Sequence, residues 1–230
     1  MSLNIMVGML ADLKIHDPEG FAYYQDRFSR INRVLLANGL PQHDEPAELT
    51  DAGPRDFDMG GYSRLHYLRR LAAYLWAGED EPAPGEETTL DDATVQRSRD
   101  WLERYYAAAG ADTTRLASRF DHLTWHSDTE GYYLPVVFKN VLIPDSYLNI
   151  VGEQIGSSQA LMEECQRLAD FLELPLDLDP DSEPVWAAAS SGQGVGDTRW
   201  ERYGIESFTC LRLYHAARAS LDLGAAIVFG

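Results

Sequence analysis

Residues 121–135, DHLTWHSDTEGYYLP, mix apolar and titratable side chains more densely than any other part of the chain. Apolar and polar residues alternate over residues 122–126, a period of two that predicts a β-strand. Residues 127–131 are mostly turn-forming residues and end in glycine, and residues 132–138 predict the returning strand. The stretch therefore predicts a β-hairpin, in which Pro135 places the second strand at a sheet edge or at a bulge.

Two histidines in this stretch have the four-residue spacing of a helical zinc motif. On the predicted strand His122 and His126 lie about 13 Å apart, too far to bind one zinc ion, so we predict no metal site. His126 and Asp128 lie closer, about 7 Å apart at the backbone. A carboxylate at that distance could orient the imidazole and raise its pKa. The alternative, which the pattern favours, is that Asp128 and Ser127 stabilise the turn through the backbone.

Outside the hairpin, apolar residues recur mainly at helical spacing. This spacing predicts helices over residues 17–38, 62–77, 157–173 and 203–223. A fifth helix is predicted to begin after Thr89, in a variant of the capping box, and to end at Gly110. Short apolar runs at residues 4–10 and 225–229 predict two strands that lie beside each other in a sheet.

The predicted helices are separated by isolated strands, without the regular alternation of a doubly wound sheet. We therefore expect an α+β fold, in which a small mixed or antiparallel sheet packs against about five helices. The length of the chain fits a single domain over residues 1–230. A flexible linker is expected at residues 78–88, where proline, glycine and acidic residues cluster with nothing to bury.

Acidic residues dominate the charge of the chain. It contains 37 Asp and Glu against 19 Lys and Arg, which gives a formal net charge of −18. This charge disfavours binding to nucleic acid or to an anionic membrane surface, and it favours a basic protein partner. Solubility is the other explanation of the charge. Because the sequence shows neither a secretory leader nor a membrane-spanning apolar run, we expect a cytoplasmic protein.

Two further places carry candidate binding residues. His66 and Arg70 lie one helical turn apart and could contact an anionic group together, although pairing of the arginines with the chain's own acids is favoured. Ser157 and Ser158 open a helix, where free backbone N–H groups and hydroxyls could hold an anion. The ordinary role of a serine at this position is the helix N-cap, and we favour it.

Other motifs are incomplete. Asp177, Asp179 and Asp181 have the spacing of the first half of a calcium loop, but serine and alanine stand where that loop needs glycine and glutamate. The chain has no phosphate-binding loop and no dinucleotide fingerprint, so we predict no cofactor. Cys165 and Cys210 fall on apolar helix faces, which predicts buried thiols rather than a disulfide.

Four segments carry a resemblance to known sequences. They are GYSRLHYLRRLAA, HLTWHSDTEGYYLP, IGSSQALMEE and YGIESFTCLRLYHAA. Through them the chain resembles a set of bacterial hypothetical proteins that share the pattern HSD-x-EGYY-x-P. The resemblance covers most of the chain and implies no activity.

Two functions of different classes fit these observations. The first is a soluble acidic interaction module, similar to an immunity protein or an adaptor, that binds a basic protein partner. The second is a small-molecule-binding protein or a hydrolytic enzyme, with a site around the 122–135 hairpin and the start of the 157–173 helix. The residues of that second site are His126, Asp128, Tyr132, Ser157 and Ser158, joined by His66 and Arg70. The charge of the chain favours the interaction module.

Overall fold

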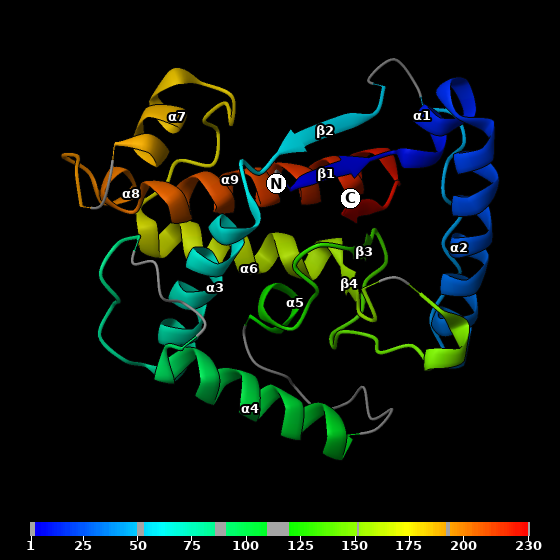
Figure 1. Cartoon of the computed structure of the whole chain (residues 1–230), viewed down its shortest axis with the longest axis horizontal. Helices are drawn as coiled ribbons and strands as arrows, with labels where there is room; N and C mark the ends of the chain where they lie inside the picture. Colours follow the sequence, from blue (N-terminus) through cyan, green and yellow to red (C-terminus); the bar gives the residue numbers. More distant parts are fainter. Residues whose placement is uncertain are drawn as a thin grey trace.

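The apolar runs at the two ends of the chain meet in the middle of a five-stranded sheet (Figure 1). The computed structural model describes residues 3–49, 53–85, 91–109, 120–150, 152–191 and 194–229. Its strands are β1 (Asn4–Val7), β2 (Arg55–Asp58), β3 (Gly131–Leu134), β4 (Ile155–Ser157) and β5 (Ile227–Phe229). Within these ranges the longer helices are α2 (Pro18–Ala37), α3 (Tyr62–Ala77), α4 (Ala93–Ala109), α6 (Ser158–Leu172) and α9 (Gly204–Leu223). The shorter ones are α1 (Met9–His16), α5 (Asp121–Thr124), α7 (Glu183–Ser190), α8 (Arg199–Arg202) and a 3₁₀ turn at Ser146–Leu148.

The sheet is mixed, with the strand order β2-β1-β5-β3-β4. β5 pairs antiparallel with β1, which confirms that the two ends of the chain lie side by side. β3 pairs antiparallel with β5 and parallel with β4. The predicted α+β class with a small mixed sheet is therefore confirmed, and the described residues form nine helices rather than about five.

Side chains of the strands alternate between two apolar clusters. Tyr133 faces the larger cluster, which is built with α3, α6 and α9, and it shares that cluster with Ile227 and Phe229 of β5. Tyr132 and Val228 face the smaller cluster, which is built with α2. Helices therefore cover both faces of the sheet, as its period-two alternation requires.

The predicted hairpin is wrong. Residues 121–124 form the short helix α5, and β3 pairs with β5 and β4 rather than with a strand preceding it. The reason lies in α6, where the buried carboxylate of Glu164 accepts hydrogen bonds from the backbone N–H groups of His122 (3.1 Å) and Leu123 (2.8 Å). These bonds satisfy free N–H groups of the first helical turn. The alternation of five neighbouring residues cannot reveal them, because their acceptor lies on another helix. Pro135 follows an inner strand, because β4 rather than β3 forms the edge.

Two other predicted boundaries differ from the structure. The N-terminal strand ends at Val7 because Gly8 adopts a left-handed conformation, with φ of 87°, and α1 begins directly after it. Thr89 and Gly110, the predicted limits of the fifth helix, lie outside the described residues. In the described part, Asp92 begins that helix by accepting a hydrogen bond from the backbone N–H of Thr94 (2.8 Å).

The described part of the predicted linker packs against α9. The hydroxyl of Tyr203 donates to the carbonyl of Pro82 (2.8 Å), and the carboxylate of Glu206 accepts from the N–H of Gly85 (3.1 Å). Residues 86–88 of the linker lie outside the described residues. Cys165 and Cys210 are buried free thiols, as their apolar helix faces predict.

The contact between β4 and β3 generates a stability prediction. A Cβ atom at Gly156 would lie 2.2 Å from Cδ1 of the buried Tyr133 ring. Gly156→Ala should therefore lower the free energy of unfolding by roughly 1–3 kcal/mol, the usual cost of overpacking a core. Urea unfolding followed by circular dichroism measures this change. Equal midpoints for the variant and the parent chain would contradict the packing described.

Candidate functional site

Equal numbers of arginines and acids are buried among the described residues. The arginines are Arg27, Arg69, Arg70 and Arg212, and the acids are Glu45, Asp121, Glu164 and Glu206. The guanidinium groups of these arginines bind backbone carbonyls or the chain's own carboxylates. Most acids of the described residues remain exposed. Because burial removes as many acids as arginines from the described surface, that surface keeps the acidic excess of the composition.

The longest interval without a cation lies between α6 and α8. Residues 168–198 contain seven acids and neither Lys nor Arg. Six of the exposed acids among them follow one another from the end of α6 to the start of α7. We call the surface that these six form the acidic end. Its members are Asp170, Glu173, Asp177, Asp179, Asp181 and Glu183. The segment connecting α6 to α7 lies at the side of the molecule that carries α7 and α8 (Figure 1).

Apolar and ionic contacts fix the backbone of the acidic end. Leu174 is buried in the larger core cluster, and Leu176 and Leu178 pack against that cluster. From α9, the buried Arg212 donates to the carbonyl of Pro180 (3.0 Å) and to the carboxylate of Asp181 (2.7 Å). The leucines thus point inward between acids that point outward, so the carboxylates are held on an ordered loop.

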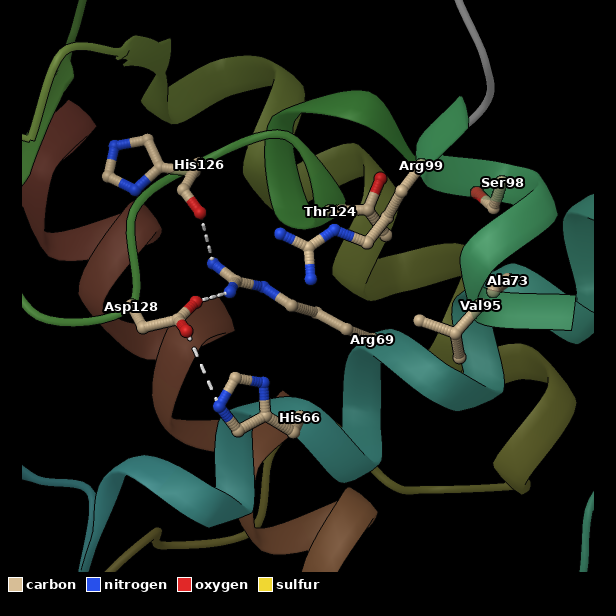
Figure 2. Close-up of a pocket in the computed structure, with 9 residues that line it drawn as sticks. All are labelled: His66, Arg69, Ala73, Val95, Ser98, Arg99, Thr124, His126 and Asp128. Atoms are coloured by element: carbon tan, nitrogen blue, oxygen red, sulfur yellow. Dashed lines mark hydrogen bonds and ion pairs between the residues drawn. The ribbon is translucent and has the colours of Figure 1, made fainter. Parts of the chain in front are cut away.

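A second candidate site is a cavity of about 50 Å³ between α3, α4 and the segment that follows α5 (Figure 2). Its walls contain three of the residues selected from the sequence, together with two arginines. The lining residues are His66, Arg69, Ala73, Val95, Ser98, Arg99, Thr124, His126 and Asp128. The cavity opens beside a larger groove of about 570 Å³ over residues 124–130 and 152–154.

Arg69 organises one wall of this cavity. Its Nε donates to the carbonyl of Leu123 (2.7 Å), and its Nη2 donates to the carbonyls of His126 (2.8 Å) and Ser127 (3.2 Å). The same guanidinium forms an ion pair with Asp128 (Figure 2). Burial lowers the pKa of Arg69 to about 10, so it stays charged at neutral pH.

Among the described residues, neither a hydrogen bond nor an ion pair joins His126 to Asp128, the pair that was considered beside the favoured turn. Both ring nitrogens of His126 lie near backbone carbonyls, of Ser127 (3.1 Å) and Tyr132 (3.2 Å), and the ring stacks on Tyr133 at 4.1 Å between centroids. Asp128 pairs instead with Arg69 and with His66, the latter at 3.4 Å. Burial lowers the pKa of His126 to about 3, opposite to the increase expected from a neighbouring carboxylate.

The remaining selected residues lie elsewhere. Tyr132 packs against Phe28 in the smaller cluster, with ring centroids 5.8 Å apart. Ser157 caps α6 by accepting from the N–H of Ala160 (3.4 Å) and donates to a carbonyl. Ser158 shares a hydrogen bond with a buried serine of α9, and Arg70 pairs with an aspartate at 2.8 Å. The structure therefore brings His66, His126 and Asp128 together but does not assemble the seven residues into one site.

His122 is a structural residue in this arrangement. The backbone N–H of Ser157 donates to its Nδ1 (3.0 Å), which leaves the proton on Nε2 to donate to the carbonyl of Lys139 (3.0 Å). Burial lowers its pKa to about 4, so the ring is neutral at physiological pH. The strand geometry that we used to separate His122 from His126 does not exist, because His122 lies in α5. Among the described residues, no group of three or more His, Cys, Asp or Glu side chains could hold a metal ion.

Sequence reasoning missed the buried carboxyl groups, and of the four among the described residues Glu164 and Asp121 lie at α5. Burial raises the pKa of Glu164 well above its usual value, and the nearby Asp121 raises it further. Asp121 accepts a hydrogen bond from the hydroxyl of Tyr106 (2.5 Å), and burial raises its pKa to about 6. A signal was present for Glu164, since it occupies the apolar stripe of α6 three residues after Leu161.

A family model described as "Putative DNA-mimic protein" matches residues 1–229. No curated protein and no solved structure matches the chain. Within the residues that the structure describes, no helix has the length and apolar character needed to cross a membrane.

The buried carboxylate of Asp121 predicts a pH dependence of stability. A carboxyl pKa raised by folding, from 3.8 to about 6, means that the folded state binds the proton more tightly than the unfolded state. Stability should therefore fall as the pH rises through this interval, by up to about 3 kcal/mol. Asp121→Asn keeps an acceptor for Tyr106 and should flatten this part of the profile. Parallel profiles for the two chains between pH 4 and 7, measured by urea unfolding, would refute the assignment.

Proposed function

Because the chain belongs to the family described as "Putative DNA-mimic protein", we propose that it occupies the DNA-binding surface of a basic protein and excludes DNA from it. The observation that carries this proposal is the acidic end, a run of exposed carboxylates without an intervening cation. Proteins bind the DNA backbone chiefly through Lys and Arg contacts to phosphates. A surface of closely spaced carboxylates presents negative charge to such cations, as the phosphates of DNA do.

Several acids elsewhere on the surface are already neutralised by neighbouring cations. Glu48 pairs with Lys14 at 2.5 Å, and Asp26 pairs with Arg30 at 2.7 Å. Glu79 also forms an ion pair, with an arginine of α4. In the acidic end only Asp181 has an ion-pair partner among the described residues, and that partner is buried. The remaining five carboxylates keep their charge available for a partner.

The order of the loop favours binding. A surface that is fixed before association loses less conformational entropy than one that must first become ordered. Arg212 and the three inward leucines provide this order. In addition, the six carboxylates lie within a short loop and two helix ends. Many of them are therefore closer together than the Debye length of about 10 Å at 0.1 M salt, so that their electrostatic fields add.

This proposal refines the interaction module expected from the composition. The net charge predicts a basic partner, and the description of the family supports the proposal that this partner is a protein that binds DNA. The alternative of a hydrolytic site loses support, because the hydroxyls of Ser157 and Ser158 are fully buried and hydrogen-bonded inside the fold.

The proposal predicts that neutralising the acidic end weakens partner binding. The test variant carries Asp177→Asn, Asp179→Asn and Glu183→Gln, which remove three exposed charges without removing a core side chain. Proteins captured by the immobilised parent chain are identified, and the affinity of a captured DNA-binding protein is measured by calorimetry. We expect duplex DNA to displace that protein from the parent chain, and the variant to bind it about tenfold or more weakly.

A charge-matched variant provides the control. Asp44→Asn, Asp56→Asn and Glu103→Gln remove the same number of exposed charges from other parts of the surface. This control should lose much less affinity than the test variant, since its acidic end is intact. Equal losses in both variants would show that net charge alone governs binding. A captured protein that duplex DNA fails to displace would contradict mimicry of DNA.

A further inference from the structure

The small cavity between α3 and α4 concentrates positive charge in an otherwise acidic chain. Arg69 reaches it from α3 and Arg99 from α4, and their guanidinium groups face the same space (Figure 2). Among the described residues that line the cavity, Asp128 is the only one with a carboxylate. Burial lowers the pKa of His66, and the two arginines lower it further, which indicates that their charges act at this point. One positive charge is therefore left uncompensated.

Arg99 differs from the arginines around it. Arg69 is engaged by three carbonyls and Asp128, and Arg97, two residues earlier on α4, pairs with Glu79. Within the part of the chain that the structure describes, Arg99 has neither a hydrogen bond nor an ion pair. Its five N–H donors are thus available in a planar fork, the arrangement that matches a carboxylate or a phosphate.

We propose that this cavity binds the carboxylate or phosphate group of a small molecule, between the guanidinium groups of Arg99 and Arg69. Arg99 supplies a bidentate contact, and Arg69 supplies the one N–H that its internal contacts leave over. The hydroxyl of Ser98, which is buried in the same wall, lies on the cavity as a further donor. A volume of about 50 Å³ suits one such small group.

The adjoining groove sets the character of the rest of the ligand. It shares Arg99, Thr124, His126 and Asp128 with the cavity, so that a molecule anchored there extends over residues 152–154. Exposed Glu130 and Glu153 line the groove. Their charges oppose a second anionic group, and hence the remainder of the ligand is neutral or cationic. The site lies apart in sequence from the acidic end and does not depend on the proposed mimicry of DNA.

The site predicts saturable binding of oxyanions. The probes are inorganic phosphate and acetate, each compared with chloride at equal ionic strength and pH 7.5, with thermal unfolding and calorimetry as the measurements. We expect phosphate or acetate to raise the Tm of the parent chain beyond chloride, with a dissociation constant on the order of 1 mM for so small a ligand. Stronger binding of phosphate would identify a phosphate-bearing ligand, and stronger binding of acetate a carboxylic acid.

Two arginine variants of α4 make this test specific. Arg99→Gln should weaken binding about tenfold, because it removes the charged fork while leaving an exposed polar residue on the helix. Arg104→Gln is the control, since Arg104 is exposed on the same helix and, among the described residues, hydrogen-bonds only to a backbone carbonyl of its own helix. The proposal is overturned if neither anion exceeds chloride in the parent chain, if Arg99→Gln keeps the full affinity, or if Arg104→Gln loses as much.

Discussion

Two buried side chains, Glu164 and Arg69, hold residues 121–128, and the small cavity is built on the segment that they fix. The carboxylate of Glu164 accepts the N–H groups of His122 and Leu123, and the guanidinium of Arg69 binds the carbonyls of Leu123, His126 and Ser127. The segment is thereby connected to α6 and to α3 through its own backbone groups. Removing either side chain would leave the backbone groups that it binds buried without partners, the situation in which a buried polar network is most costly. This connection also leads the chain into β3, next to the centre of the sheet.

The inward placement of arginines has a functional consequence at the surface. The guanidinium groups of Arg69, Arg70 and Arg212 bind internal carbonyls and a few carboxylates. Their charges therefore contribute little to the electrostatic field outside the protein. Arg212 also orders the loop whose other acids stay exposed. Arg99, in contrast, lies at the small cavity and has neither a hydrogen bond nor an ion pair within the described part of the chain. The order of the acidic end and the proposed oxyanion site thus both depend on where individual arginines lie.

The fold could be predicted from the sequence where elements are long or strongly apolar. The helices α2, α3, α6 and α9 show repeated apolar spacing, and the terminal strands pair as expected. The segment 121–128 could not be predicted, because a four-residue helix has no period of its own and its partners lie on other elements. The expectation of a basic partner follows from net charge, whereas the structure was needed to show that the carboxylates of the acidic end are exposed and that its leucines face inward. The pairing of Asp128 with His66 and Arg69 joins residues about 60 positions apart, beyond the reach of local spacing.

Hydrogen–deuterium exchange on both members of a complex with a captured DNA-binding protein tests the central claim most directly. The account predicts protection of residues 170–183 in this chain. It also predicts that the partner's protected peptides are those that duplex DNA protects. Protection of the partner away from its DNA-binding surface, with residues 170–183 exchanging as in the free chain, would contradict the account.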